Sequence, residues 1–167
     1  MFSGVGFVAR GGTYYQRRNV DAVTVRGVEA ALMWSRGPWS LRAGASLTRA
    51  RVSAADEAPL LDGLRPAETP AFSASLAAGW SKDGKAVQLV VRRVGQQYGD
   101  DLNTQSLKAA TTLDAFASWP IGRNLQIVAR GENLGDALVM AGINGDGSIE
   151  RATPRTLWIG VRLGSWR

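Results

Sequence analysis

The residues best suited to chemistry are three carboxylates, Glu29, Asp114 and Glu132, which lie within segments of alternating residue type. Paired carboxylates can exchange protons as a general acid and a general base. No motif for such chemistry surrounds them, and the sequence contains no histidine and no cysteine. The commonest general base, a thiolate nucleophile and the usual zinc ligands are therefore absent. We expect no enzyme activity, no catalytic residues, no metal and no cofactor, and we interpret the three carboxylates as members of a polar network.

Two loop segments carry oxygen ligands that could bind a cation. Residues 144–150 read Asn-Gly-Asp-Gly-Ser-Ile-Glu and superficially resemble a calcium-binding loop. With the Asp-Gly dipeptide at the fifth and sixth loop positions, Gly142 and Thr153 occupy the first and twelfth, where such loops need carboxylates. We therefore predict a surface turn rather than a calcium site. Asp100 and Asp101, which could contact an ion or ligand, are interpreted as part of a solvated acidic loop.

Strands must position these side chains, because the dominant sequence pattern is alternation with period two. From Trp39 to Thr48 the odd positions are apolar, and the even positions are Ser, Arg, Gly, Ser and Thr. A strand sends successive side chains to opposite faces, so this segment has one apolar and one polar face. The pattern predicts seven strands and a less regular eighth strand near Gly4 to Tyr15. The seven cover residues 23–34, 39–52, 71–80, 87–92, 113–119, 125–132 and 157–163.

The polar phase of these strands contains charged and amide side chains. In a transmembrane barrel the polar face lines the lumen and the apolar face meets lipid. Charges inside a barrel need partners or water. We therefore predict eight lumen-facing polar residues: Glu29, Arg42, Gln88, Arg92, Asp114, Gln126, Arg130 and Glu132.

The connections alternate in length, and tryptophans flank the short ones. Short turns are predicted at residues 35–38, 81–85 and 120–124, and long connections at 53–69, 95–108 and 135–154. Short turns on one side and long loops on the other are typical of outer-membrane barrels. Four tryptophans in the apolar phase are predicted to form an aromatic belt at the membrane interface: Trp34, Trp39, Trp80 and Trp119. A soluble sandwich tends instead to bury its tryptophans in the middle of strands.

Composition is compatible with one domain over residues 1–167. Hydrophobic residues make up 45% of the chain and the mean hydropathy is −0.10, as expected if only every second strand residue is apolar. No apolar run approaches the ~18 residues of a membrane-spanning helix. The net charge is +6, yet the arginines are scattered singly along strands rather than clustered. We therefore do not expect a nucleic-acid partner.

Six short motifs occur in a specific order along the chain. They are Arg26-Gly27-Val28-Glu29, Gly63-Leu64-Arg65-Pro66 with Thr69-Pro70, Arg92-Arg93-Val94-Gly95-Gln96-Gln97-Tyr98 with Asp100-Asp101, Leu113-Asp114, Glu132-Asn133-Leu134-Gly135-Asp136 and Thr153-Pro154-Arg155-Thr156. Their order and spacing resemble the C-terminal third of TonB-dependent outer-membrane receptors. The resemblance covers nearly the whole chain.

This resemblance implies an antiparallel up-and-down transmembrane β-barrel in the bacterial outer membrane. Such receptors import a scarce nutrient, commonly a ferric siderophore or cobalamin, through a 22-stranded barrel that holds a plug domain. The implied partners are outer-membrane lipid and lipopolysaccharide, together with the rest of a barrel and its plug. The chain contains no plug, so it is not expected to transport alone. Two alternatives stay open: a closed eight-stranded outer-membrane barrel with a structural role, and a soluble lipocalin-like binder.

A set of arginines falls in the apolar phase near the long-loop ends of the strands. Guanidinium groups suit phosphate, so we predict contact with lipopolysaccharide phosphates. Snorkelling of ordinary surface arginines from the membrane would explain the same positions. The set comprises Arg26, Arg49, Arg51 and Arg93.

Overall fold

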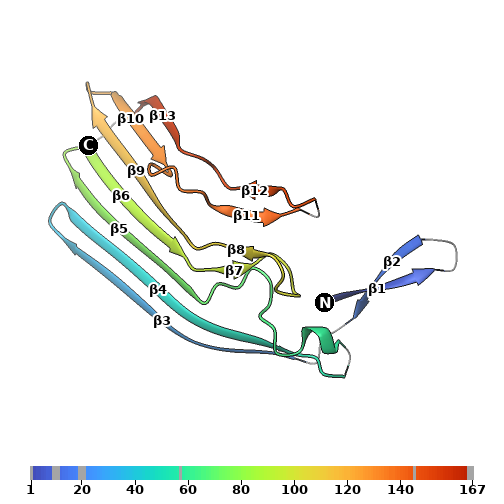
Figure 1. The fold of residues 1–167 in the computed structure, drawn as a ribbon. Coiled ribbons are helices and arrows are strands. Elements are labelled where there is room, and N and C mark those ends of the chain that lie inside the picture. Colours follow the sequence, from blue (N-terminus) through green and yellow to red (C-terminus); the bar gives the residue numbers. More distant parts are fainter. Residues whose placement is uncertain (1, 9–11, 19–21, 57, 145, 165–167) are drawn as a thin grey trace.

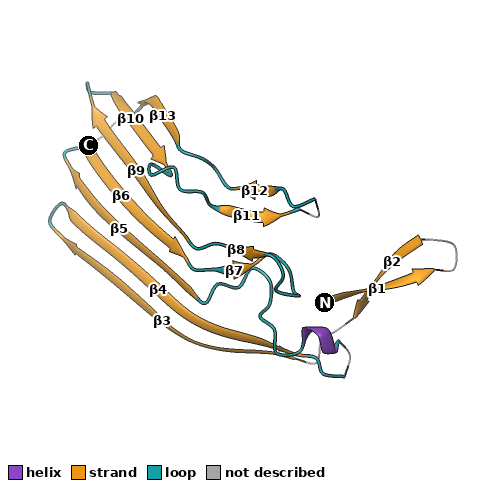
Figure 2. Ribbon diagram, viewed as in Figure 1, coloured by secondary structure: helices purple, strands orange, loops and turns teal. Residues whose placement is uncertain are grey.

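Seven strands form one antiparallel sheet in which every strand pairs with its neighbours along the chain (Figures 1 and 2). The computed structural model describes residues 2–8, 12–18, 22–56, 58–144 and 146–164. The strand order confirms the predicted antiparallel meander. The strands are β3 (Ala22–Arg36), β4 (Trp39–Ser53), β5 (Phe72–Lys82), β6 (Lys85–Val94), β9 (Ala110–Pro120), β10 (Leu125–Glu132) and β13 (Thr156–Leu163).

Short turns join β3 to β4, β5 to β6 and β9 to β10, as predicted. In the second of these turns, Asp83 and Gly84 have φ angles of 50° and 74°. A two-residue hairpin turn of type I′ needs positive φ at both central residues, which is why Asp-Gly favours it. The three longer connections, at residues 54–71, 95–109 and 133–155, lie at the opposite ends of the strands.

The pairing register aligns the apolar positions of neighbouring strands on one face of the sheet and the polar positions on the other. One row runs through Leu41, Ala78, Leu89 and Ala115, and the next row along the strands runs through Arg42, Ala77, Val90 and Asp114. We call the face that carries Leu41 the apolar face and the face that carries Arg42 the polar face. A register shift of one residue in any strand would mix the two.

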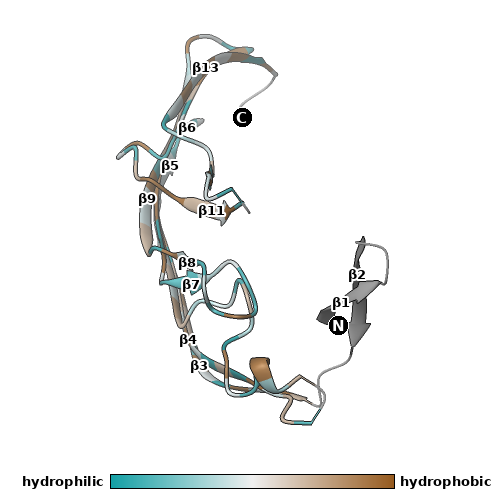
Figure 3. Ribbon diagram, turned by 45° about the vertical axis from the view of Figure 1, so that its right-hand side comes forward, coloured by the Kyte–Doolittle hydropathy of each residue, from teal (hydrophilic) through white to brown (hydrophobic). Residues whose placement is uncertain are grey.

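The long connections fold over the polar face, which is the concave side of the curved sheet (Figure 3). In the first connection, the short 3₁₀ helix η1 (Pro59–Leu61) brings Leu61 against Val52 and Ala54, and all three are buried. The other two connections contain short hairpins that the sequence pattern did not predict. Their strands are β7 (Gln97–Tyr98), β8 (Ser106–Leu107), β11 (Met140–Ile143) and β12 (Ile149–Arg151). In the described ranges, no helix is long and apolar enough to cross a membrane.

The N-terminal segment differs from its prediction. β1 (Phe2–Val8) and β2 (Gly12–Arg18) pair with each other and form a separate two-stranded sheet. The single strand predicted near Gly4 to Tyr15 is therefore wrong, because that segment is divided between two strands. Pairing with an adjacent segment closes a short loop and costs less chain entropy than pairing across the molecule. β3 and β13 consequently remain the two edges of the seven-stranded sheet.

Candidate functional site

The register places all eight predicted lumen residues on the polar face, although they come from five strands. Glu29 lies opposite Ser46, Arg42 opposite Ala77 and Gln88 opposite Phe116. The remaining five are distributed over three neighbouring strands: Arg92 on β6, Asp114 on β9, and Gln126, Arg130 and Glu132 on β10. The face therefore combines both signs of charge with amide groups.

Two ion pairs organise the charged part of the polar face. Arg92 pairs with Asp114, and Arg130 pairs with Glu132. The second Asp114 oxygen, Oδ1, accepts a hydrogen bond from the Asn133 N–H at 2.9 Å, so both carboxylate oxygens are engaged. The Arg130 guanidinium also lies over the ring of Trp158, 5.7 Å from its centroid. The two carboxylates are therefore engaged by partners on the same face, as members of the polar network predicted from the sequence.

The third candidate carboxylate stands apart from this network. Glu29 lies on the edge strand β3, whereas Asp114 is on β9, and three strands separate β3 from β9 in the sheet. Within the part of the chain that the structure describes, no group of three or more acidic side chains could hold a metal ion. The three carboxylates therefore do not converge on one centre.

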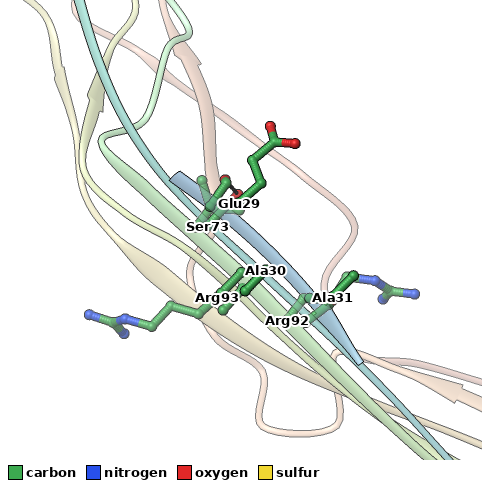
Figure 4. A pocket seen from close by; sticks show the side chains of 12 residues that line it. Glu29, Ala30, Ala31, Ser73, Arg92 and Arg93 are labelled. Atoms are coloured by element: carbon green, nitrogen blue, oxygen red, sulfur yellow. Dashed lines mark hydrogen bonds between the residues drawn. The ribbon is translucent and has the colours of Figure 1, made fainter. Parts of the chain in front are cut away.

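Glu29 and Arg92 instead border a shallow depression floored by small residues (Figure 4). Ala31, Gly44 and Ser75 follow one another across three strands, and Ser75 lies opposite Arg92. Figure 4 shows Arg92 and its neighbour Arg93 extending to opposite sides of the sheet. The depression is polar at its margins and open.

The apolar face carries the four predicted belt tryptophans at the short-turn ends of their strands. Trp39 lies directly opposite Trp80, and Trp119 lies opposite Ile127. Trp34, Trp39 and Trp119 are about half exposed, at 48%, 57% and 50%. The Lys85 ammonium lies over the Trp119 ring, 4.5 Å from its centroid. Side chains with an apolar body and a polar edge suit the boundary between hydrocarbon and water.

The predicted phosphate-contact arginines lie toward the other end of the apolar face. Arg26 on β3 lies directly opposite Arg49 on β4, and Arg51 lies opposite Thr24. Arg93, on β6, lies opposite Ala74 and donates a hydrogen bond to Thr111 Oγ1 at 2.8 Å. No described acidic side chain forms an ion pair with any of these four arginines.

A clamp between two long connections lies at the rim of the polar face. Asn103 Oδ1 accepts a hydrogen bond from the Arg65 N–H at 3.0 Å, and Asn103 Nδ2 donates to the Arg65 carbonyl at 2.7 Å. Asp101 Oδ1 accepts from the Ala67 N–H at 3.2 Å. These contacts join residues 54–71 to residues 95–109, so two of the motif segments in the sequence meet in space.

Asp100 holds the second of these connections in its own conformation. Its carboxylate accepts hydrogen bonds from the Gln105 N–H at 2.7 Å and from the Thr104 hydroxyl at 2.8 Å. Partial burial tends to raise the pKa of Asp100, but the hydrogen bonds from Gln105 and Thr104 outweigh it, and the pKa is lowered. Asp100 and Asp101 thus lie in a partly exposed acidic loop, where Asp100 bonds within the connection and Asp101 bonds to the neighbouring one.

A second clamp involves the Glu-Asn-Leu-Gly-Asp motif after β10. Asn133 is 4% exposed. Its Oδ1 accepts from the Ala137 N–H at 2.9 Å, and its Nδ2 donates to the carbonyls of Ala137 and Thr153. Asp136 Oδ1 accepts from the Arg155 N–H at 3.1 Å. Asn133 and Asp136 therefore connect the end of β10 to the segment before β13.

The segment with calcium-loop character joins β11 to β12. The Asp146 carboxylate accepts a hydrogen bond from the Ser148 N–H at 2.9 Å, and hydrogen bonds from Ser148 lower the pKa of Asp146. Gly147 has a φ of 82°, in the left-handed region that favours glycine. The segment is thus a hairpin turn whose carboxylate is used locally.

Residue-level reasoning from the sequence missed the roles of Asn103, Asp101 and Asn133. Their partners are main-chain groups of distant segments, which side-chain patterns do not reveal. A signal was nevertheless present, because Asp101 and Asn133 belong to the short motifs quoted above.

Gln126, predicted as a lumen residue, is 3% exposed, and its side-chain amide donates a hydrogen bond to the Gly84 carbonyl at 2.8 Å.

Comparison with known proteins gives one family match and several similar structures. The sequence model of the family described as "TonB dependent receptor-like, beta-barrel" matches residues 2–134. A search among curated proteins found no match. The ferric yersiniabactin uptake receptor FyuA from Yersinia pestis is similar over 97% of this chain, with a TM-score of 0.77 and 20% identity.

Two further receptors have the same fold. The siderophore receptor PiuA from Acinetobacter baumannii matches 84% of this chain with a TM-score of 0.72 and 17% identity. The closed form of the ferric-catecholate import receptor Fiu from E. coli K12 matches 95%, with a TM-score of 0.69 and 21% identity. The chain spans only 33%, 22% and 23% of the lengths of FyuA, PiuA and Fiu, respectively.

Proposed function

The chain belongs to the TonB-dependent receptor-like β-barrel family, and from this premise we propose that it forms part of the barrel wall of an outer-membrane nutrient receptor. Membership confirms the predicted family and the predicted location in the bacterial outer membrane. The similar structures are receptors by name and not enzymes.

The observation that carries the proposal is a long, curved sheet with two unpaired edges. β3 and β13 each have a neighbour on one side only. Backbone groups left unpaired in hydrocarbon cost several kcal/mol each, so a spanning sheet must close. The N-terminal hairpin pairs within itself, which disfavours the small eight-stranded barrel. We propose that both edges pair with further strands of a larger barrel, and that the chain alone does not transport.

The two faces support the same assignment. The apolar face exposes large side chains such as Val28 at 69%, Ile159 at 81% and Leu163 at 79%, which a soluble lipocalin-like barrel would bury inside. We propose that lipid covers this face. The polar face then surrounds the lumen, where its ion pairs and amides meet water and a plug domain.

For the transported nutrient we propose a ferric siderophore or a molecule of similar class, such as cobalamin. FyuA, PiuA and Fiu are named for ferric yersiniabactin, siderophore and ferric-catecholate recognition, respectively. These names support an iron chelate over cobalamin. The clamped long connections at the rim are the part of this chain best placed to meet such a ligand before it enters.

Cellular uptake tests the proposal directly. Cells lacking other receptors would express either this chain alone or the chain joined to the remaining strands and plug of a receptor, and accumulation of radiolabelled ferric siderophores and cobalamin would be measured. We expect uptake only from the complete barrel. Heat-modifiable gel migration verifies folding of the complete barrel and reports whether the chain alone closes into one. Uptake or a heat-resistant closed barrel from the chain alone would contradict the proposal.

A further inference from the structure

We propose that Arg26, Arg49 and Arg51 form a binding site for the phosphate groups of lipopolysaccharide on the apolar face. The inference rests on the proposed outer-membrane barrel and adds a lipid partner at named residues. Arg93 is on the same face but two strands away on β6, level with Ala45 of β4, and is not part of this site.

The positive charge of these arginines is unbalanced on their own face of the sheet. Arg26 and Arg49 lie directly opposite each other in the β3–β4 ladder, with Arg51 two residues further along β4. Like charges directly opposite in a sheet are destabilising. The described strand positions on this face contain no aspartate and no glutamate. An anion from outside the chain would relieve this repulsion.

The depth of Arg49 in the membrane matches the level of lipid phosphates. Arg49 follows Trp39 by ten residues along β4, which is about 33 Å of strand at about 3.3 Å per residue. A strand tilted by about 40° converts this to roughly 25 Å of height, which is the height of the apolar band of such barrels. The intervening side chains on this face are Leu41, Ala43, Ala45 and Leu47. Arg49 therefore lies one hydrocarbon thickness from the tryptophan belt, at the level of headgroup phosphates.

The position of the arginines along the strands identifies the leaflet and the ligand. The arginines lie at the long-connection ends of β3 and β4, and long loops are extracellular in outer-membrane barrels. The outer leaflet there consists of lipopolysaccharide, whose lipid anchor carries phosphates. Guanidinium groups bind phosphate oxygens in a bidentate manner, which a snorkelling cation does not require. Arg26 and Arg49 are both exposed and can reach such groups.

The test measures thermal unfolding of the complete barrel in detergent, with and without lipopolysaccharide. The variant is Arg26→Gln with Arg49→Gln, and the matched control is Arg36→Gln, on the same face of β3 but at the short-turn end. We expect lipopolysaccharide to raise the midpoint for the wild type and the control, and this rise to be lost in the double variant. Dephosphorylated lipopolysaccharide and inorganic phosphate are expected to leave all three unchanged.

The unfolding midpoint of the double variant is also informative in the absence of lipopolysaccharide. Because it removes a repulsive pair, its midpoint without lipopolysaccharide should equal or exceed that of the wild type, whereas a purely structural role predicts a fall. An equal rise with lipopolysaccharide in all three proteins, or the same rise with the dephosphorylated form, overturns the inference. Heat-modifiable migration of each protein reports barrel folding separately, so failure of the proposed function is distinguishable. If the double variant does not fold, Arg26→Lys with Arg49→Lys replaces it and should retain a reduced rise.

Discussion

At the scale of single residues, Asn103 pairs with Arg65 as one strand residue pairs with another, through one accepted and one donated hydrogen bond. Asn133 does the same for the segment after β10. Both residues have positive φ, 57° and 46°, a conformation that asparagine tolerates better than most residues. The amide side chain and the backbone preference thus explain why asparagine occupies each position.

Replacement of Asn103 should release the first long connection. Asn103→Gly keeps the backbone accessible to positive φ but removes both hydrogen bonds, and we expect a cost of about 1–3 kcal/mol. Asn103→Ala should cost more, because it adds backbone strain. Hydrogen exchange at the Arg65 amide measures the release. Asn124→Gly, in the exposed β9–β10 turn, is the control, and unchanged protection in Asn103→Gly would exclude the clamp.

Acidification should loosen the loop around Asp100. Its pKa lies below the ordinary value of 3.8, so the stabilisation is fully present above that pH and is lost as the pH falls through the lower, native value. We expect the protection of the Thr104 and Gln105 amides to drop in that range, measured by hydrogen exchange corrected for intrinsic rates. Asp100→Asn should show no such transition, and a transition of equal size in that variant would assign it to another group.

At the scale of elements, the β3–β4 hairpin depends on close approach of its strands. A Cβ added at Gly27 would lie 2.6 Å from the Leu47 carbonyl oxygen, whereas at Gly44 the nearest atom, Ser75 Oγ, is 3.7 Å away. Both glycines lie within strands, yet only Gly27 is required by contact with rigid backbone. This difference separates a glycine needed for packing from one that is replaceable.

The two glycines therefore give a matched pair of variants. Gly27→Ala should destabilise the barrel by about 1–3 kcal/mol, because overpacking forces strand β4 to move. Gly44→Ala should be neutral or stabilising by up to about 1 kcal/mol, because it restricts the unfolded chain. Urea unfolding in lipid vesicles measures both. Equal effects of the two substitutions would show that the local contact does not matter.

At the scale of the whole molecule, the difference between the apolar and the polar face of the sheet determines which face contacts lipid and which contacts water. Most of the exposed large apolar residues of the strands lie on the apolar face, whereas Val25, Met33 and Trp158 lie on the polar face. The ion pairs and the folded-in connections are on the polar face. The arrangement is the reverse of a soluble protein, in which exposed apolar patches are small. A bilayer on the convex side accounts for it.

Charge placed on the convex face should impair membrane assembly according to depth. Ile159 lies in the middle of β13 and Leu163 at its short-turn end, and both are about 80% exposed, at 81% and 79%. Ile159→Arg should cost about 2–4 kcal/mol and Leu163→Arg about 0–1 kcal/mol. Folding yield in vesicles, followed by heat-modifiable migration, measures the difference. Equal yields would mean that β13 does not present this face to hydrocarbon.

The sequence by itself determined the seven strands of the main sheet, their alternating faces and the order of short and long connections. These features depend on local periodicity and turn chemistry, as Asp83-Gly84 and the run from Trp39 to Thr48 illustrate. Only the tertiary structure decided which residues meet across the sheet or between connections, such as Arg26 with Arg49 and Asn103 with Arg65. It also decided that the N-terminal segment pairs with itself. Such contacts depend on register and on main-chain groups far apart in the chain, and a period-two pattern carries no information about either.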